Sequence, residues 1–196
     1  MTGHQSSTGA IPDSIATMLY ARSTAEAFLY LDLHLCSCEY PALDQVDDWL
    51  EKRDGVFVAV FDGRCSTCSG SGRYEFELET AELVRYPAIG GSTPSRIIDP
   101  GEFLWLSDRA ASEVPVDFTG LLKQELGVAH GLMRRAIVTL EEVLKFIPEG
   151  ADEVPENAFF SDLGRSLREE SPERLRYEEI TARLASYRSG MRELEA

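Results

Sequence analysis

Apolar residues fall at every second position in one early segment, which is the spacing of a β-strand with one buried face. Leucines form this alternating set in residues 28–35, so the pattern predicts a strand there, with a helix that persists to Leu31 as the alternative. Helix-start signals come before it. The Pro-Asp-Ser sequence at residues 12–14 predicts a short helix through Leu19, and the Ser-x-x-Glu spacing at residues 23–26 predicts a further helical turn.

Two more segments have strand character. Residues 56–61 are a run of β-branched and aromatic residues, and residues 73–79 alternate so that one face carries Tyr74, Phe76 and Leu78. Turn-forming residues fill the interval between them, residues 62–72. The sequence therefore predicts a β-hairpin with a long tip.

The second half of the chain has helical spacing. Asp99 followed by Pro100 is typical of a helix start, and apolar residues then recur at steps of three and four through residues 119–147. Further helices are predicted near residues 157–170 and from Pro172 onward. The last segment carries a seam of apolar residues that favours packing within its own domain, with a partner helix as the alternative: Tyr177, Ile180, Leu184, Tyr187, Met191 and Leu194.

Four cysteines fall into two closely spaced pairs, Cys36 with Cys38 and Cys65 with Cys68. Four thiolates on two turns suit a tetrahedral structural zinc site, and the second pair lies at the tip of the predicted hairpin. Buried thiols are one alternative. A redox C-x-x-C pair is another, but such pairs sit at a helix N-terminus rather than between two strands.

On these cysteines, residues 33–79 resemble a zinc ribbon, in which two cysteine knuckles on β-hairpins clamp one zinc ion. The resemblance implies one structural zinc and no particular activity. The first knuckle departs from the family pattern, because one residue separates Cys36 from Cys38 and Glu39 stands where glycine often follows. His34 is therefore an alternative ligand to one of these cysteines.

The expected fold class is α+β, with a small antiparallel zinc-ribbon-like N-terminal part packed on an α-helical C-terminal part. Residues 1–12 are expected to be a flexible lead-in, and residues 13–88 to form the β-region with its short N-terminal helix. A linker rich in glycine and serine then leads into a helical region over residues 96–196, expected to pack as one unit with the first part.

Composition changes the picture mainly through charge. The 196 residues are 43% hydrophobic and 27% charged, as in ordinary globular proteins, but the net charge is −15. Such a field repels nucleic acid and anionic lipid and attracts basic partners, although solubility alone also explains it. No apolar run has the length of a membrane span and no secretory signal stands out, so a cytoplasmic location is expected.

An acidic face is predicted between the two cysteine pairs. If this segment is helical, the spacing of its carboxylates places four of them on one side: Asp44, Asp47, Asp48 and Glu51. A solvated face is the ordinary interpretation of such a cluster. The functional interpretation is a docking patch for a basic protein.

Catalytic signatures are missing from the sequence, which has no nucleophile elbow, phosphate-binding loop or metalloprotease motif. The best remaining expectation is a non-enzymatic protein-binding module, for example an immunity or antitoxin-type inhibitor of a basic toxin. An enzyme with a structural zinc is the alternative, with a site assembled from scattered residues: Asp99, Glu102, Asp108 and Arg109, together with His34 or His130. A nucleic-acid-associated zinc ribbon ranks last, and the oligomeric state stays open.

Overall fold

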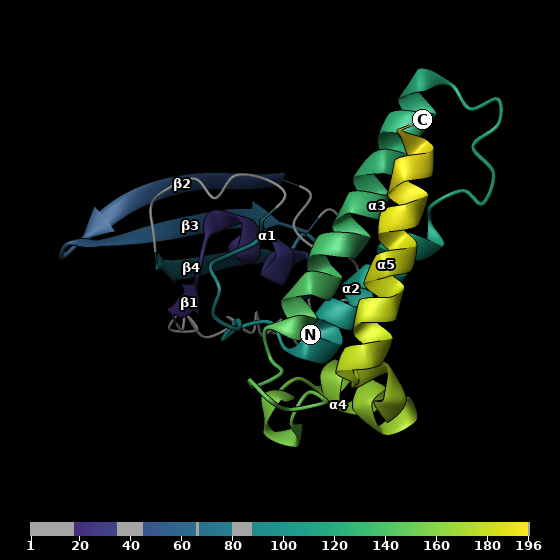
Figure 1. The fold of residues 1–196 in the computed structure, drawn as a ribbon. Helices are drawn as coiled ribbons and strands as arrows, with labels where there is room; N and C mark the ends of the chain where they lie inside the picture. Colours follow the sequence, from purple (N-terminus) through teal and green to yellow (C-terminus); the bar gives the residue numbers. More distant parts are fainter. Residues whose placement is uncertain (1–17, 35–44, 66, 80–87, 196) are drawn as a thin grey trace, which may run out of the picture.

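The computed structural model describes residues 18–34, 45–65, 67–79 and 88–195, which form a mixed α+β fold (Figure 1). The α+β expectation is confirmed at this level. The elements in chain order are β1 (Leu19–Ala21), α1 (Thr24–Leu33), β2 (Gln45–Arg53), β3 (Val56–Arg64), β4 (Ser71–Leu78), α2 (Pro100–Ser112), α3 (Lys123–Leu144), η1 (Glu156–Ala158), α4 (Asp162–Glu170), η2 (Pro172–Leu175) and α5 (Tyr177–Leu194).

The sheet has the strand order β1-β4-β3-β2, so β2 is an outermost strand. Strands β2, β3 and β4 form an antiparallel meander, and β1 adds to β4 in parallel. Asp54 and Gly55 make the two-residue turn from β2 to β3 with φ of +50° and +90°. Both residues in the left-handed region are the mark of a type I′ turn, whose twist matches that of the flanking strands. The predicted hairpin of β3 and β4 is confirmed.

Helix α1 covers one face of the sheet. Its Phe28 ring lies edge-on to Phe61 at 4.9 Å between centroids, and Tyr30 meets Phe76 in the same way at 5.6 Å. The strand predicted over residues 28–35 is therefore wrong as far as the described residues run. The helical alternative holds because Ser23 caps the helix by accepting from the Glu26 amide, which is the predicted capping contact.

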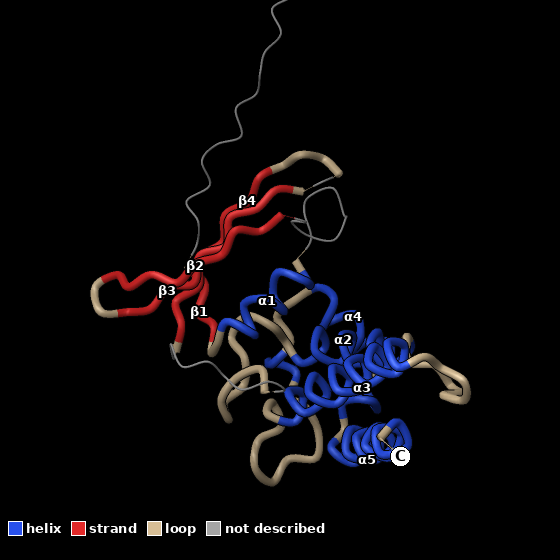
Figure 2. Tube along the Cα trace, turned by 90° about the horizontal axis from the view of Figure 1, so that it is seen from above, coloured by secondary structure: helices blue, strands red, loops and turns tan. Residues whose placement is uncertain are grey.

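The helical part is built on two long helices, α3 and α5, which lie side by side (Figures 1 and 2). Helix α2 packs on α3 and begins with the predicted cap, in which Asp99 accepts from the Glu102 amide. The apolar seam of α5 packs within the chain, as predicted, with Ile180 and Leu184 both buried. Among the described residues, none of the helices combines the length and apolar character that crossing a bilayer requires.

Two other expectations for the N-terminal part need correction. Leu19 lies in β1 rather than in the predicted short helix, whose remaining residues lie outside the described ranges. The acidic segment that holds Asp47, Asp48 and Glu51 is strand β2, not a helical face or a connection. It is a strand because β3 offers it a full ladder of backbone partners from Gln45 to Arg53, which the local sequence does not reveal.

Candidate functional site

The second cysteine pair lies in the tight loop that joins β3 to β4. The Cys65 amide donates to the Gly70 carbonyl at 2.8 Å, and the Ser69 amide donates back to the Cys65 carbonyl at the same distance. Ser69 has φ of +58°, which turns the chain around the pair. The Gly70 amide donates to Cys68 Sγ at 3.4 Å. An N–H donor on sulfur favours the thiolate, which is the form that binds a metal.

The remaining predicted zinc ligands are not placed. Cys36 and Cys38 lie outside the described residues, and within the described ranges no three His, Cys, Asp or Glu side chains group as a metal site would require. His34 ends α1, where its ring stacks on Tyr30 at 3.8 Å and its Nε2 lies 3.7 Å from Glu102 Oε1. Burial lowers the pKa of His34, which favours its neutral form. The four-cysteine site stays a prediction.

The predicted acidic face is carried by an exposed edge strand, apart from Asp44, which lies outside the described residues. Because side chains alternate along a strand, Asp47 and Glu51 lie on one face of the sheet and Asp48 on the other. Asp47 and Asp48 are exposed, and Glu51 is partly so. The carboxylates therefore line the edge of the sheet instead of one helical face.

Two large apolar side chains stand between these acids. Trp49 is 40% exposed and Leu50 is 47% exposed. The Arg73 guanidinium lies over the Trp49 ring, 5.3 Å from its centroid. Neither residue carries a motif in the sequence. An aromatic and an aliphatic residue flanked by acids is the only signal that marks them.

The sheet face away from α1 carries an ordered set of charges, which we name the outer ladder: Glu51, Arg53, Arg73 and Glu75. Arg53 bridges two carboxylates, pairing with Glu51 and, at 2.5 Å, with Glu75. Arg73 also reaches Glu75, at 2.9 Å. Hydrogen bonds from Arg53 lower the pKa of Glu75, so this carboxylate stays charged. The ladder holds the side chains next to Trp49 in fixed positions.

A second charged group is buried where β1 and α1 meet α3, and we name it the inner cluster: Arg22, Glu26, Glu142 and Lys145. Arg22 is 2% exposed and donates from Nε to Glu26 at 2.8 Å, while its Nη2 lies 2.9 Å from Glu142. Lys145 completes the cluster through Glu142 at 2.6 Å. Two cations face two carboxylates, so the cluster is neutral.

The residues proposed for a scattered enzyme site have structural partners. Asp99, fully buried, accepts from the Phe160 and Ser161 amides, and Glu102 is 3% exposed. Burial raises the pKa of Glu102 to about 7. The structure brings His34 to these two carboxylates, with its Nε2 3.7 Å from Glu102. The others have different partners: Asp108 pairs with Arg174 and Arg183, Arg109 lies over Trp105, and His130 lies 3.2 Å from Glu195.

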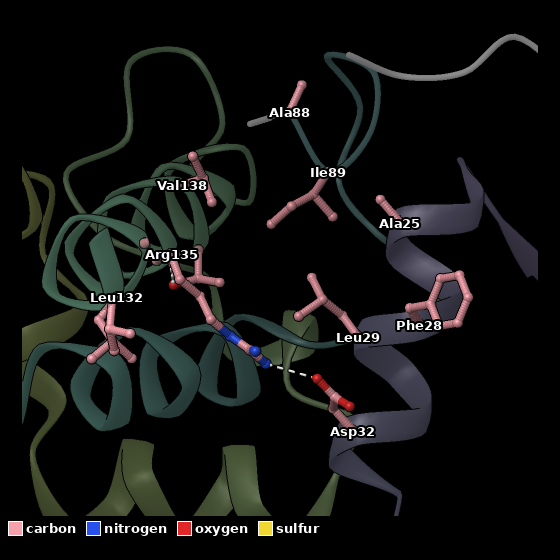
Figure 3. Close-up of a pocket in the computed structure, with 12 residues that line it drawn as sticks. Ala25, Phe28, Leu29, Asp32, Ala88, Ile89, Leu132, Arg135 and Val138 are labelled. Atoms are coloured by element: carbon pink, nitrogen blue, oxygen red, sulfur yellow. Dashed lines mark hydrogen bonds and ion pairs between the residues drawn. The ribbon is translucent and has the colours of Figure 1, made fainter. Parts of the chain in front are cut away.

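An apolar groove runs between α1 and α3 (Figure 3). It encloses about 530 Å³ and has aliphatic walls, with Leu29 from α1 and Ile89 facing Leu132 and Val138 from α3. An ion pair between Asp32 and Arg135, 2.9 Å long, spans it from one wall to the other. Its volume and apolar lining fall within the range of small-molecule pockets.

Comparison with known proteins finds no family model that matches the sequence, no similar curated protein and no solved structure that matches the fold. The interpretation of these surfaces therefore depends on their own residues.

Proposed function

We propose that this chain is a non-enzymatic, acidic protein-binding module that docks a basic partner along strand β2. One observation carries the proposal: β2 is an outermost strand whose exposed Trp49 and Leu50 stand among exposed carboxylates. A strand edge offers backbone donors and acceptors to an added strand, and charged side chains along the edge limit which strands it accepts. On β2 the exposed acids Asp47 and Asp48 directly precede Trp49, and the basic residues Lys52 and Arg53 come at the end of the strand.

Strand addition explains why these residue types occur together. Backbone hydrogen bonds along β2 would hold an extended segment, while alternate side chains of that segment would meet one face of the sheet. On the outer-ladder face the partner meets Asp47, Trp49 and Glu51 in order, which suits an apolar residue between two lysines or arginines. The field of 15 net negative charges accelerates the encounter.

An immunity or antitoxin-type inhibitor is the concrete form that fits this surface. Such a protein needs no catalytic groups, because covering a basic toxin is sufficient to neutralise it. The support is the acidic field together with the structural use of Asp99 and Glu102, which leaves these carboxylates buried in helix caps.

Binding is tested by affinity capture with the wild-type chain and the double variant Asp47→Asn, Asp48→Asn. We expect a basic protein that the wild type retains, that the variant loses, and that dissociates at about 0.5 M salt, where exposed charges are screened. The captured protein is then purified and its affinity is measured with purified components. If it is a toxin, co-expression of the wild type restores growth and the variant does not.

The matched control is Glu169→Gln with Glu170→Gln, which removes two adjacent exposed carboxylates at the end of α4, on the helical side of the molecule. Both double variants lose the same charge. Equal binding by the two variants would show that net charge alone attracts the partner and would contradict docking on β2.

We further propose one structural zinc held by Cys65 and Cys68 together with Cys36 and Cys38. The fit of the described pair is good, because the loop turns tightly and the Gly70 amide donates to Cys68 Sγ. Bound zinc would stabilise the tip of the β3–β4 hairpin without taking part in a reaction.

Metal analysis of the purified protein tests this proposal. We expect about one zinc per chain, lost in Cys68→Ser together with part of the thermal stability. Thr67→Ala, at an exposed residue, is the control within the same loop. If the purified wild type contains no zinc and Cys68→Ser is equally stable, the zinc site is refuted. The β2 proposal is unaffected by that outcome.

A further inference from the structure

We propose that the groove between α1 and α3 is a second docking site, which takes an amphipathic helix with basic residues on its polar face. This inference goes beyond the proposed function because it concerns a different surface and a different conformation of the bound segment. It shares with that function only the positive charge of the partner.

The groove has the length of a helix. A smaller hollow of about 320 Å³, between α3 and the loop before it, shares Val128 and Leu132 with the larger one, so the two follow α3 from Gln124 to Thr139. At 1.5 Å per residue this stretch measures roughly 22 Å, or four helical turns. Apolar hollows that follow one another along a helix suit the i, i+3, i+4, i+7 face of an amphipathic helix.

Exposed apolar side chains line the larger hollow. Phe28 at its α1 wall is 47% exposed and Val128 on α3 is 59% exposed, although each lies next to buried positions. Covering them would remove apolar surface from water, which is the main favourable contribution to association.

A glycine in the middle of α3 points to a partner that approaches closely. Gly131 lines the groove, and a Cβ built there meets no atom within 4 Å. Glycine inside a helix costs up to about 1 kcal/mol relative to alanine, and packing within this chain does not require it here. Its absent side chain leaves space for the backbone or a large side chain of a bound segment.

The charges around the groove select the partner. In the larger hollow Asp32 and Arg135 neutralise each other, whereas the charged residues that line the smaller hollow are Glu113, which lies 3.6 Å from Arg109, and Glu125, which faces no cation among the ion pairs of the described residues. A basic helix complements this acidic end. An anionic amphiphile would meet repulsion there, and a second copy of this chain would bring another net charge of −15.

The test uses a synthetic helix of about 16 residues, long enough for the four turns, with leucine on one face and lysine on the other. Its scrambled form has the same composition without the apolar face. We expect the ordered peptide to bind the full chain by fluorescence anisotropy at about 0.15 M salt, where long-range attraction is screened, and the scrambled peptide to bind at least about tenfold more weakly.

Gly131→Leu is the decisive variant, because it adds an apolar side chain to the groove at a position where a Cβ meets no atom within 4 Å. We expect it to weaken peptide binding by about tenfold or more, while its melting temperature stays at or above that of the wild type, since leucine favours helix over glycine. Gly127→Leu is the matched control: it makes the same change on the same helix, also with open space, at a residue that lines neither hollow.

Three results would overturn the inference: equal binding of the ordered and scrambled peptides, equal loss in both glycine variants, or a dimer of the free chain that Gly131→Leu dissociates. The outcome is separate from that of the β2 proposal. Asp47→Asn with Asp48→Asn leaves the groove intact and should bind the peptide like the wild type.

Discussion

The inner cluster and the outer ladder are built from the same two kinds of side chain, yet they differ in what surrounds them. Arg22 and Glu26 in the inner cluster are almost completely buried, whereas Arg53 in the outer ladder keeps 35% of its side chain exposed. A buried charge without its partner is costly, because water cannot replace the lost contact, while an exposed pair contributes little. Removing one charge from the inner cluster is therefore expected to cost more stability than removing one from the outer ladder.

The largest expected effect is on the inner cluster. Arg22→Ala leaves two buried carboxylates, Glu26 and Glu142, with Lys145 as their remaining cation, and should lower the free energy of unfolding by about 3–5 kcal/mol. Chemical denaturation at neutral pH measures this loss. A loss below about 1 kcal/mol, which is typical of exposed ion pairs, would contradict this prediction.

A pH-dependent effect is expected at Glu102. Burial raises its pKa in the folded state to about 7, so the folded chain keeps a proton that the unfolded chain releases near pH 4.5. Its contribution to stability therefore falls as the pH rises from about 4.5 to about 7. Glu102→Gln should match the wild type at about pH 4 and exceed it by up to about 3 kcal/mol at pH 8.

Groups near Glu102 also titrate, so the quantity to follow is the difference in free energy of unfolding between the wild type and Glu102→Gln at each pH. The lowered pKa of His34 gives a slope of opposite sign below about pH 6.5, and the Asp99 carboxylate also faces the site. Denaturation curves of both proteins across this range are compared. A difference that does not vary with pH would contradict the raised pKa.

The next largest effect on stability is expected where helix α4 lies close to the start of helix α2. A Cβ on Gly164 would lie 2.2 Å from both carboxylate oxygens of Asp99, the residue that caps α2. Gly164→Ala should therefore cost about 2 kcal/mol, as overpacking in a tight interior does, and lower the melting temperature. Gly131→Ala, which meets open space, should leave it unchanged or raise it.

The smallest effect on stability is expected in the outer ladder. Arg53→Ala removes the side chain that bridges Glu51 and Glu75, yet the denaturation midpoint should remain close to that of the wild type, because water solvates the two carboxylates. Partner affinity is the sensitive measurement here, and for a basic partner it should rise, because the substitution frees the Glu51 carboxylate on the same face as Trp49. A large loss of stability would instead make the ladder part of the core.

The sequence predicted elements whose signals are local. The capping contact of Ser23, the start of α2 at Asp99 and the hairpin of β3 with β4 all depend on residues close together in the chain. Strand β2 was missed because its partner ladder, rather than its own acidic sequence, makes it extended. The helix α1 was mistaken for a strand because its apolar residues surround the helix, so leucines at alternate positions lie on opposite sides and are still all packed against the core.

The candidate surfaces were less predictable for a related reason. The pairing of Arg22 with Glu142 joins residues from opposite halves of the chain, and no spacing in the sequence relates them. The groove likewise exists only where α1, Ile89 and α3 meet. The acidic residues of β2 were predicted to lie on a helical face, so the alternation that separates Asp47 from Asp48 went unseen.

The pairing within the inner cluster also matters while the chain is being synthesised, from its N-terminus to its C-terminus. Its four charges divide into two neutral pairs, Arg22 with Glu26 and Glu142 with Lys145, and each pair is local in sequence. A ribosome releases the first pair long before the second is synthesised. The early half can therefore wait with its arginine already neutralised, and the later half arrives with its own charges matched.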